Sequence, residues 1–138
     1  MSDYSQRLEQ ERSRFDADLC VHDLPDIFHY WANKYPRATL NAHGYDNIED
    51  FFVVEMARLA DSLATPLRAV SVGAGDCGHE IAVAKGLLER GLGDFSILCL
   101  DISEGALGRA RESIEAQGLA GQVATMVHDF NQGLPPGG

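Results

Sequence analysis

The sequence has 138 residues, of which 45% are hydrophobic, and a formal net charge of -10 from 21 acidic against 11 basic side chains. A chain of this length has room for one core, and an acidic balance without a basic stripe argues against direct binding of nucleic acid. Residues 1–18 are charged and polar, and no apolar run approaches the ~20 residues of a membrane span. We therefore expect a cytoplasmic protein that does not bind a membrane.

The first 66 residues are expected to form a helical N-terminal extension. Residues 4–19 carry apolar side chains loosely on one helical face among many charges. A short helix should begin near Asp26 and end near Lys34, because Pro36 disfavours helical backbone in the residue before it. Asn47 then has the character of an N-cap for a long amphipathic helix.

Aromatic residues gather at the end of the short helix. Tyr30, Trp31 and Tyr35 lie close together in sequence and are followed by Arg37. These side chains have two expected roles, either packing into the core or closing over a bound cation as a lid, since aromatic faces attract positive groups.

From residue 67 onward, apolar runs and helical patterns alternate along the chain. The expected strands are 69–72, 95–100 and 122–127, and the expected helices are 78–90 and 104–117, the latter capped by Ser103. This alternation predicts the α/β fold class, with a Rossmann-like parallel βαβαβ half-sheet preceded by an α-helical segment. Residues 67–138 are expected to form a truncated cofactor-binding domain.

The expected half-sheet lacks a strand beside its first strand. A doubly wound sheet binds ligand where the strand order reverses, and a further strand forms the other side of that crevice. After Asp129 the sequence is rich in turn-forming residues instead. We therefore expect the sequence to be a fragment of a larger protein, or to pair with a partner chain or a second copy through the open edge of the first strand.

A glycine-rich turn follows the first strand. The stretch Gly73-Ala74-Gly75-Asp76-Cys77-Gly78 matches GxGxxG, which nicotinamide, flavin and S-adenosylmethionine folds share. A dinucleotide would place its pyrophosphate beside Asp76, where like charges disfavour binding. S-adenosylmethionine has no phosphate and carries two positive groups, so Asp76 favours this cofactor. As the alternative role, Asp76 only caps the following helix.

Two further acids follow the next two strands. Asp101 comes twenty-three residues after Gly78, at the position where this architecture binds the ribose hydroxyls. Asp129 follows the third strand, where a carboxylate can accept from the adenine amino group while the next backbone N–H donates to the ring. We expect the glycine turn and both acids to converge on one adenosine.

The segment from about Arg68 to Leu134 resembles the N-terminal half of the class I, seven-stranded S-adenosylmethionine-dependent methyltransferase domain. The stretches VSVGAGDCG, LCLDISEGALGRARE and HDFNQGLP carry this resemblance. Two positions depart from the family pattern: Ser71 stands where the family often has an acid, and Cys77 stands where a third loop glycine is common. The resemblance implies a methyltransferase acting on a small-molecule acceptor.

The resemblance also implies roles for individual residues. The backbone of the glycine loop would hold the methionine and ribose parts of the cofactor, the acid of the second loop the ribose, and the third loop the adenine. These roles fall on Gly73, Ala74 and Gly75, on Asp101 with Ile102 flanking the base, and on Asp129 with Phe130. The acceptor side of the reaction is not encoded in this stretch, so no catalytic residue is predicted.

Two other functions are compatible with the same patterns. The first is the nucleotide-binding half of an NAD(P)-dependent oxidoreductase, and the second is a non-catalytic module that binds another subunit. No metal site is expected, because Cys20, Cys77 and Cys99 form no CxxC pair and the five histidines lack HxxxH or HExxH spacing. Buried free thiols are expected instead.

Overall fold

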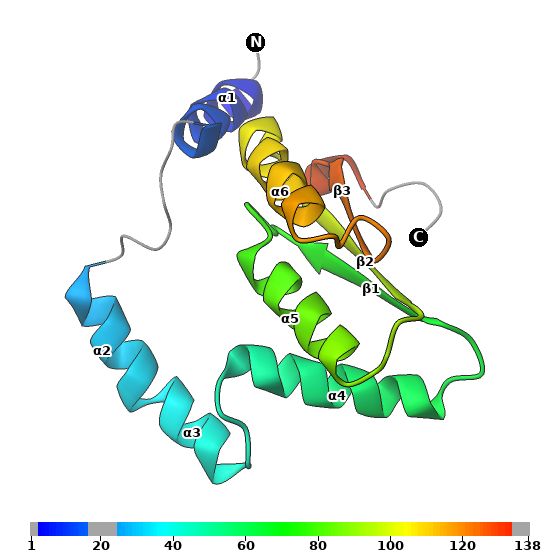
Figure 1. The fold of residues 1–138 in the computed structure, drawn as a ribbon. Helices are drawn as coiled ribbons and strands as arrows, with labels where there is room; N and C mark the ends of the chain where they lie inside the picture. The colour runs from blue at the N-terminus through cyan, green and yellow to red at the C-terminus, as the bar shows by residue number, and fades with distance from the viewer. Residues whose placement is uncertain (1–2, 17–24, 134–138) are drawn as a thin grey trace.

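Three parallel strands form the centre of the structure, a computed structural model that describes residues 3–16 and 25–133 (Figure 1). They are β1 (Leu67–Val72), β2 (Phe95–Asp101) and β3 (Val123–Val127), hydrogen-bonded in the order β1-β2-β3. The predicted βαβαβ half-sheet is confirmed, and its strands begin and end within two residues of the expected positions.

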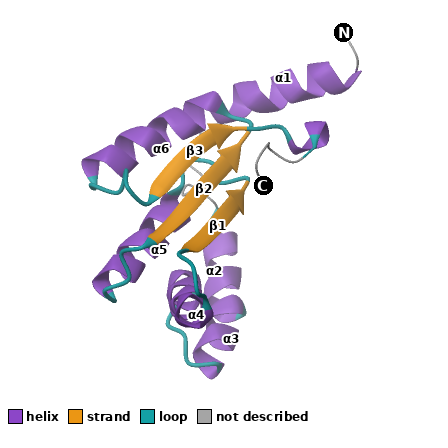
Figure 2. Cartoon of the chain, turned by 90° about the vertical axis from the view of Figure 1, so that its right-hand side faces the viewer, coloured by secondary structure: helices purple, strands orange, loops and turns teal. Residues whose placement is uncertain are grey.

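Two helices cover one face of this sheet, as Figures 1 and 2 show. These are α5 (Gly78–Glu89) and α6 (Glu104–Ala116). The Ser103 side chain accepts from the backbone N–H of Ala106 at 3.0 Å, so the predicted cap of α6 is confirmed. The core lies between helices and strands, and its fully buried side chains include Leu87, Leu107 and Cys99.

The other face of the sheet is not covered by any helix among the described residues (Figure 2). Val70 and Val72 alternate with the core-facing residues of β1 and are 59% and 62% exposed. The outer edge of β1 has no strand partner within the described part of the chain. Parallel sheets occur almost only with both faces covered, so this face and edge have the character of a surface that a further element packs on.

Helix α4 (Ile48–Ser62) joins the core through α5. Its predicted cap is confirmed, because the Asn47 side chain accepts from the backbone N–H of Asp50 at 2.8 Å. Val53 is 6% exposed and lies against Gly86 of α5. The proposed boundary between an extension, residues 1–66, and a cofactor-binding domain remains a prediction.

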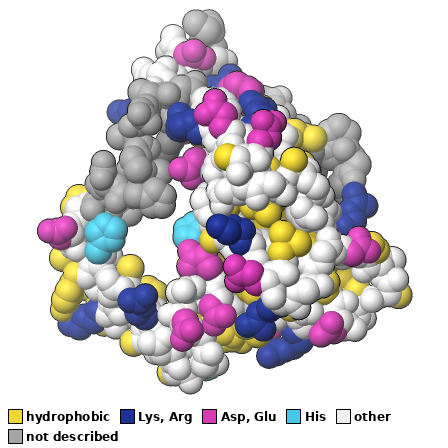
Figure 3. Space-filling model, viewed as in Figure 1, with side chains coloured by type: hydrophobic (Ala, Val, Ile, Leu, Met, Phe, Trp, Pro, Cys, Tyr) yellow, Lys and Arg dark blue, Asp and Glu magenta, His cyan; other side chains and the backbone are white. Residues whose placement is uncertain are grey.

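Helices α2 (Asp26–Lys34) and α3 (Pro36–Ala42) extend away from the sheet (Figure 1). Tyr30, Trp31 and Tyr35 are each about half exposed, and α2 buries no residue. Hydrophobic side chains are visible along the outer flank of this arm in Figure 3. The expected core packing of these aromatics was therefore wrong, because Trp31 and Tyr35 stack on each other at 4.8 Å on the exposed arm. Their role as a lid stays a prediction.

Helix α1 (Asp3–Asp16) lies beside α6, far from α2 in Figure 1. A helix was expected over residues 4–19, and the part beyond Asp16 lies outside the described residues, as does Cys20. None of the helices in the described ranges is long and apolar enough to cross a membrane, and the cytoplasmic location stays a prediction. On the face shown in Figure 3, acidic and basic side chains are interspersed.

Candidate cofactor site

The glycine turn joins the end of β1 to the start of α5. Gly73 and Gly75 have φ angles of 71° and 56°, in the left-handed region that side chains disfavour. A Cβ built on either glycine would meet no atom within 4 Å. The space beside both glycines is therefore open to a ligand, and a side chain at either position would project into it.

Cys77 also adopts a left-handed conformation, with φ of 59°. It is the one described residue other than glycine with a positive φ, at the position where the methyltransferase pattern commonly has glycine. The strain is about 1 kcal/mol or more for a residue with a Cβ. Its side chain is completely buried, so packing of the thiol offsets part of this strain.

Asp101 reaches the glycine turn directly. Its Oδ2 accepts a 2.8 Å hydrogen bond from the backbone N–H of Gly75, and its Oδ1 accepts one of 2.8 Å from Ser103. A carboxylate offers roughly four lone-pair positions, so each oxygen keeps acceptor capacity after these two bonds. The structure thus brings the acid after β2 and the glycine turn together, as expected from the sequence, while its binding of ribose stays a prediction.

Asp129 lies in the next loop along the same edge of the sheet. Val127, the last residue of β3, is paired in register with Asp101, and the backbone N–H of His128 donates to the Asp101 carbonyl at 2.9 Å. Asp129 caps the short 3-10 helix η1 (Phe130–Gln132). Phe130 is half-buried at the start of η1.

Most backbone amides of the glycine turn are already bonded within the protein. Gly73 and Ala74 donate to the Leu100 carbonyl at 2.8 and 3.1 Å, Gly75 to Asp101, Cys77 to the Ala74 carbonyl and Gly78 to the Asp76 carboxylate. Phosphate binding at such a turn depends on backbone N–H groups that point at the ligand. A pyrophosphate would have to displace these bonds and approach Asp76, so the nicotinamide alternative is not favoured.

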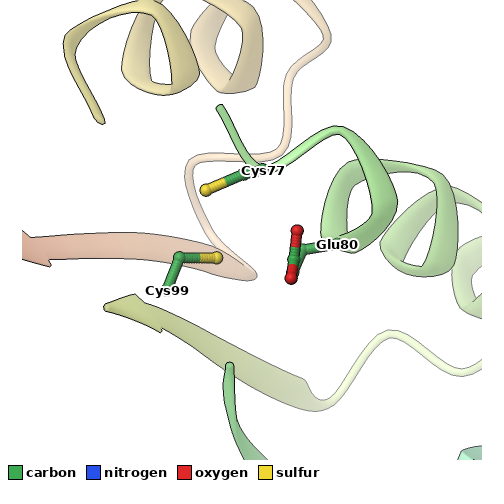
Figure 4. A group of neighbouring side chains, drawn as sticks. All are labelled: Cys77, Glu80 and Cys99. Atoms are coloured by element: carbon green, nitrogen blue, oxygen red, sulfur yellow. The ribbon is translucent and has the colours of Figure 1, made fainter. Parts of the chain in front are cut away.

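Three side chains with metal-ligating atoms meet at the buried side of the turn (Figure 4). The thiols of Cys77 and Cys99 and the Glu80 carboxylate lie within 4.8 Å of one another, and sulfur and carboxylate ligands suit zinc. However, hydrogen bonding to Cys99 and burial raise the pKa of Cys77 above its ordinary range. Metal binding needs a thiolate, which the raised pKa of Cys77 disfavours, so we assign no metal to this group.

Two features of this site were not predicted from the sequence. The Ser71 hydroxyl donates to the Glu80 carboxylate. Glu80 thus supplies a carboxylate beside Ser71, the position where the family often has an acid. From α1, Tyr4 donates to Asp129 at 2.6 Å, and the Arg12 side chain donates to the Ile102 carbonyl at 3.1 Å. The two contacts from α1 join residues 125 and 90 positions apart in the chain, so local patterns carry no signal for them.

Comparisons with solved structures identify the fold. A provisionally assigned O-methyltransferase from Klebsiella pneumoniae matches with a TM-score of 0.51 and 18% identity, over 99% of this chain and 50% of that one. The chain therefore has the fold of the first part of an S-adenosylmethionine-dependent methyltransferase domain, as the sequence predicted. It spans about half the length of that structure.

Weaker matches carry related names. A provisionally assigned sarcosine dimethylglycine methyltransferase from Galdieria sulphuraria matches with a TM-score of 0.49 and 21% identity, over 63% of this chain and 30% of that one. The S-adenosylmethionine-dependent methyltransferase SibL matches at 0.44 and 24%, over 67% and 26%. No protein-family model and no curated protein matches the sequence.

Proposed function

We propose that this chain is the S-adenosylmethionine-binding half of a methyltransferase that acts on a small-molecule acceptor. The observation that carries the proposal is the hydrogen bond between the Asp101 carboxylate and the Gly75 amide, which puts an acid with spare acceptor capacity beside an open glycine turn. Ribose hydroxyls are the donors that such an acid binds in this architecture.

The residues present fit the adenosine part of this cofactor. Gly73, Ala74 and Gly75 would face the methionine and ribose portions, and Asp101 would accept from the ribose. Ile102 and Phe130 offer apolar surface to the base, and both are half-buried. Asp129 would accept from the exocyclic amino group of adenine. Asp76, close to the same turn, adds negative charge that suits a cationic cofactor and repels a phosphate.

When bound, the cofactor supplies an electrophilic methyl group on a sulfonium. Transfer is an in-line displacement, so the contribution of the protein is to hold donor and acceptor aligned and to keep water out. The described residues provide one wall for this purpose. The residues that bind the methyl acceptor would belong to the part of the methyltransferase fold that this chain does not match, so the acceptor is not assigned.

The open edge of β1 is where we propose that the rest of the fold packs. A cavity of about 410 Å³ lies along this edge, lined by apolar side chains of α4, α5 and β1 that include Phe52, Met56 and Val83. Exposed Val70 and Val72 flank it. A parallel apolar strand would satisfy the free backbone groups of β1, complete the crevice and cover these side chains.

Nuclear magnetic resonance of the labelled chain tests the cofactor assignment, since it detects weak binding and locates it. Titration with S-adenosylhomocysteine should shift the amide signals of Gly73, Gly75, Asp101 and Asn131, whereas NADH should leave them in place. Shifts that NADH produces and S-adenosylhomocysteine does not would overturn the proposal.

A matched pair of variants separates ribose binding from general charge. Asp101→Asn should weaken S-adenosylhomocysteine binding at least tenfold, because it removes one charge-assisted acceptor. Asp94→Asn, in the exposed turn before β2, makes the same chemical change away from the site and should bind like the wild type. Equal affinity in the two variants would contradict the role of Asp101.

A further inference from the structure

Helix α1 reaches over the loops that are proposed to hold adenine. The Tyr4 hydroxyl donates to Asp129 Oδ2 at 2.6 Å, and Arg12 Nε donates to the Ile102 carbonyl at 3.1 Å. Leu8 and Arg12 from α1 meet Ile102, Val127 and Asp129 around a cavity of about 70 Å³. Ligand pockets are typically about 300 Å³ or larger, so the cavity that α1 leaves beside these loops is well below the size of a ligand pocket.

The same helix also donates to the Asp129 carboxylate, the hydrogen-bond acceptor that adenine requires. Asp129 Oδ1 accepts from the backbone N–H and the side-chain amide of Asn131, at 2.9 and 3.0 Å. Oδ2 accepts from Tyr4 and, at 3.4 Å, from Gln132. These four donors use the roughly four lone-pair positions of a carboxylate. Of these four, the Tyr4 hydroxyl is the donor that comes from outside the loop, so it is the one that adenine can replace without unfolding η1.

The contact surface of α1 suits a helix that moves. Over residues 4–14 every side chain is exposed or half-buried, and Tyr4 itself is 40% exposed. Displacing α1 therefore uncovers little apolar area, which keeps the free-energy cost of opening low.

We propose that α1 is a gate on the adenosine site, in which Tyr4 competes with the adenine amino group for Asp129. This inference rests on the proposed function. Cofactor binding displaces Tyr4 and Arg12, and in the absence of cofactor α1 shields the two loops. If α1 is a gate, removing the Tyr4 hydroxyl strengthens cofactor binding. If α1 were a fixed wall of the site, removing that hydroxyl would not strengthen binding.

Calorimetry with S-adenosylhomocysteine provides the first test. Tyr4→Phe keeps the ring, removes the competing donor and should raise the affinity about two- to tenfold, the range for one hydrogen bond. Tyr30→Phe, whose hydroxyl accepts from Lys34 on the exposed arm, is the matched control and should bind like the wild type. An unchanged or lower affinity in Tyr4→Phe would overturn the gate while leaving the proposed function in place.

A reversible crosslink provides the second test. Leu8→Cys with Val127→Cys places two thiols in the lining of the small cavity. Cys20→Ser removes one native thiol from the sequence, and the other two, Cys77 and Cys99, are buried. The oxidised protein should lose S-adenosylhomocysteine binding, and reduction should restore it. Full binding by the oxidised form would overturn the gate. Absence of binding in the wild type, Tyr4→Phe and the reduced form alike would overturn the proposed function and the gate with it.

Discussion

Val53 of α4 and Gly86 of α5 approach so closely that a Cβ on Gly86 would lie 2.6 Å from Cγ2 of Val53. Val53 is buried and its β-branched side chain has little freedom to turn away. The absence of a side chain at residue 86 therefore fixes how close the two helices pack, and through them the position of α4 beside the open edge of β1.

Gly86→Ala should destabilise the protein by about 1–3 kcal/mol, the usual cost of overpacking a core. Chemical denaturation measures this, and Gly108→Ala is the matched control. Gly108 lies within α6, where a Cβ would meet nothing within 4 Å, so alanine there should stabilise by about 0.5–1 kcal/mol through helix propensity. A change in the free energy of unfolding with the same sign for both substitutions would contradict the close α4–α5 contact.

Cys77→Gly should be more stable than Cys77→Ala, by about 1 kcal/mol, although glycine is usually the less stable of the two. Both substitutions remove the buried thiol, but alanine keeps a Cβ at a φ of 59° whereas glycine adopts this conformation freely. Thermal or urea unfolding of the two variants gives the difference. A more stable Cys77→Ala would show that the left-handed conformation is not retained.

The Tyr4–Asp129 hydrogen bond should give α1 docking a flat pH dependence around neutrality. This bond, together with the hydrogen bonds from Asn131 and Gln132, lowers the pKa of Asp129 from 3.8 to about 2, and the same bond raises the pKa of Tyr4 above 10.0. Because the folded carboxyl has the lower pKa, its stabilisation is complete above the ordinary value and is lost as pH falls from about 4 to about 2. On the alkaline side, the contact is lost as pH rises through the raised pKa of Tyr4.

Nuclear magnetic resonance of the Asp129 carboxyl carbon measures the acidic limb, and tyrosinate absorbance measures the alkaline one. In Tyr4→Phe the pKa of Asp129 should rise toward its ordinary value, and in Asp129→Asn the pKa of Tyr4 should fall toward 10.0. A pKa of Asp129 that is unmoved by Tyr4→Phe would mean that α1 does not dock on this loop in solution.

Val70→Lys should reduce association of the isolated chain through the edge of β1. An unpaired apolar strand edge recruits other strands, and a charge at this position opposes the close approach of a second chain. Light scattering over a range of concentrations follows this association. Ala124→Lys places the same charge in the same row of the sheet on β3, where Leu98 lies between the two positions, and should have a smaller effect. An equal effect of both would locate the contact elsewhere.

Local chemistry made much of this fold predictable from the sequence. Asn47 and Ser103 cap helices through bonds to residues three positions away, and the glycine turn needs backbone angles that a stretch of six residues specifies. The order of strands and helices likewise follows from hydrophobic periodicity. The position of Asp101 beside Gly75 could be predicted because parallel strands end at one edge of the sheet.

The tertiary structure decided what depends on contacts between distant residues. Tyr4 and Asp129 are 125 positions apart, and nothing in either local stretch indicates that one binds the other. The same holds for Cys77 with Cys99. The aromatic residues of α2 show the converse: Trp31 and Tyr35 have the composition of a core, yet they lie exposed because burial depends on which surfaces the rest of the chain brings to them. A sequence by itself therefore determines caps, turns and the order of elements, whose energies are local, whereas the packing of distant elements determines which acid is occupied and which helix covers the site.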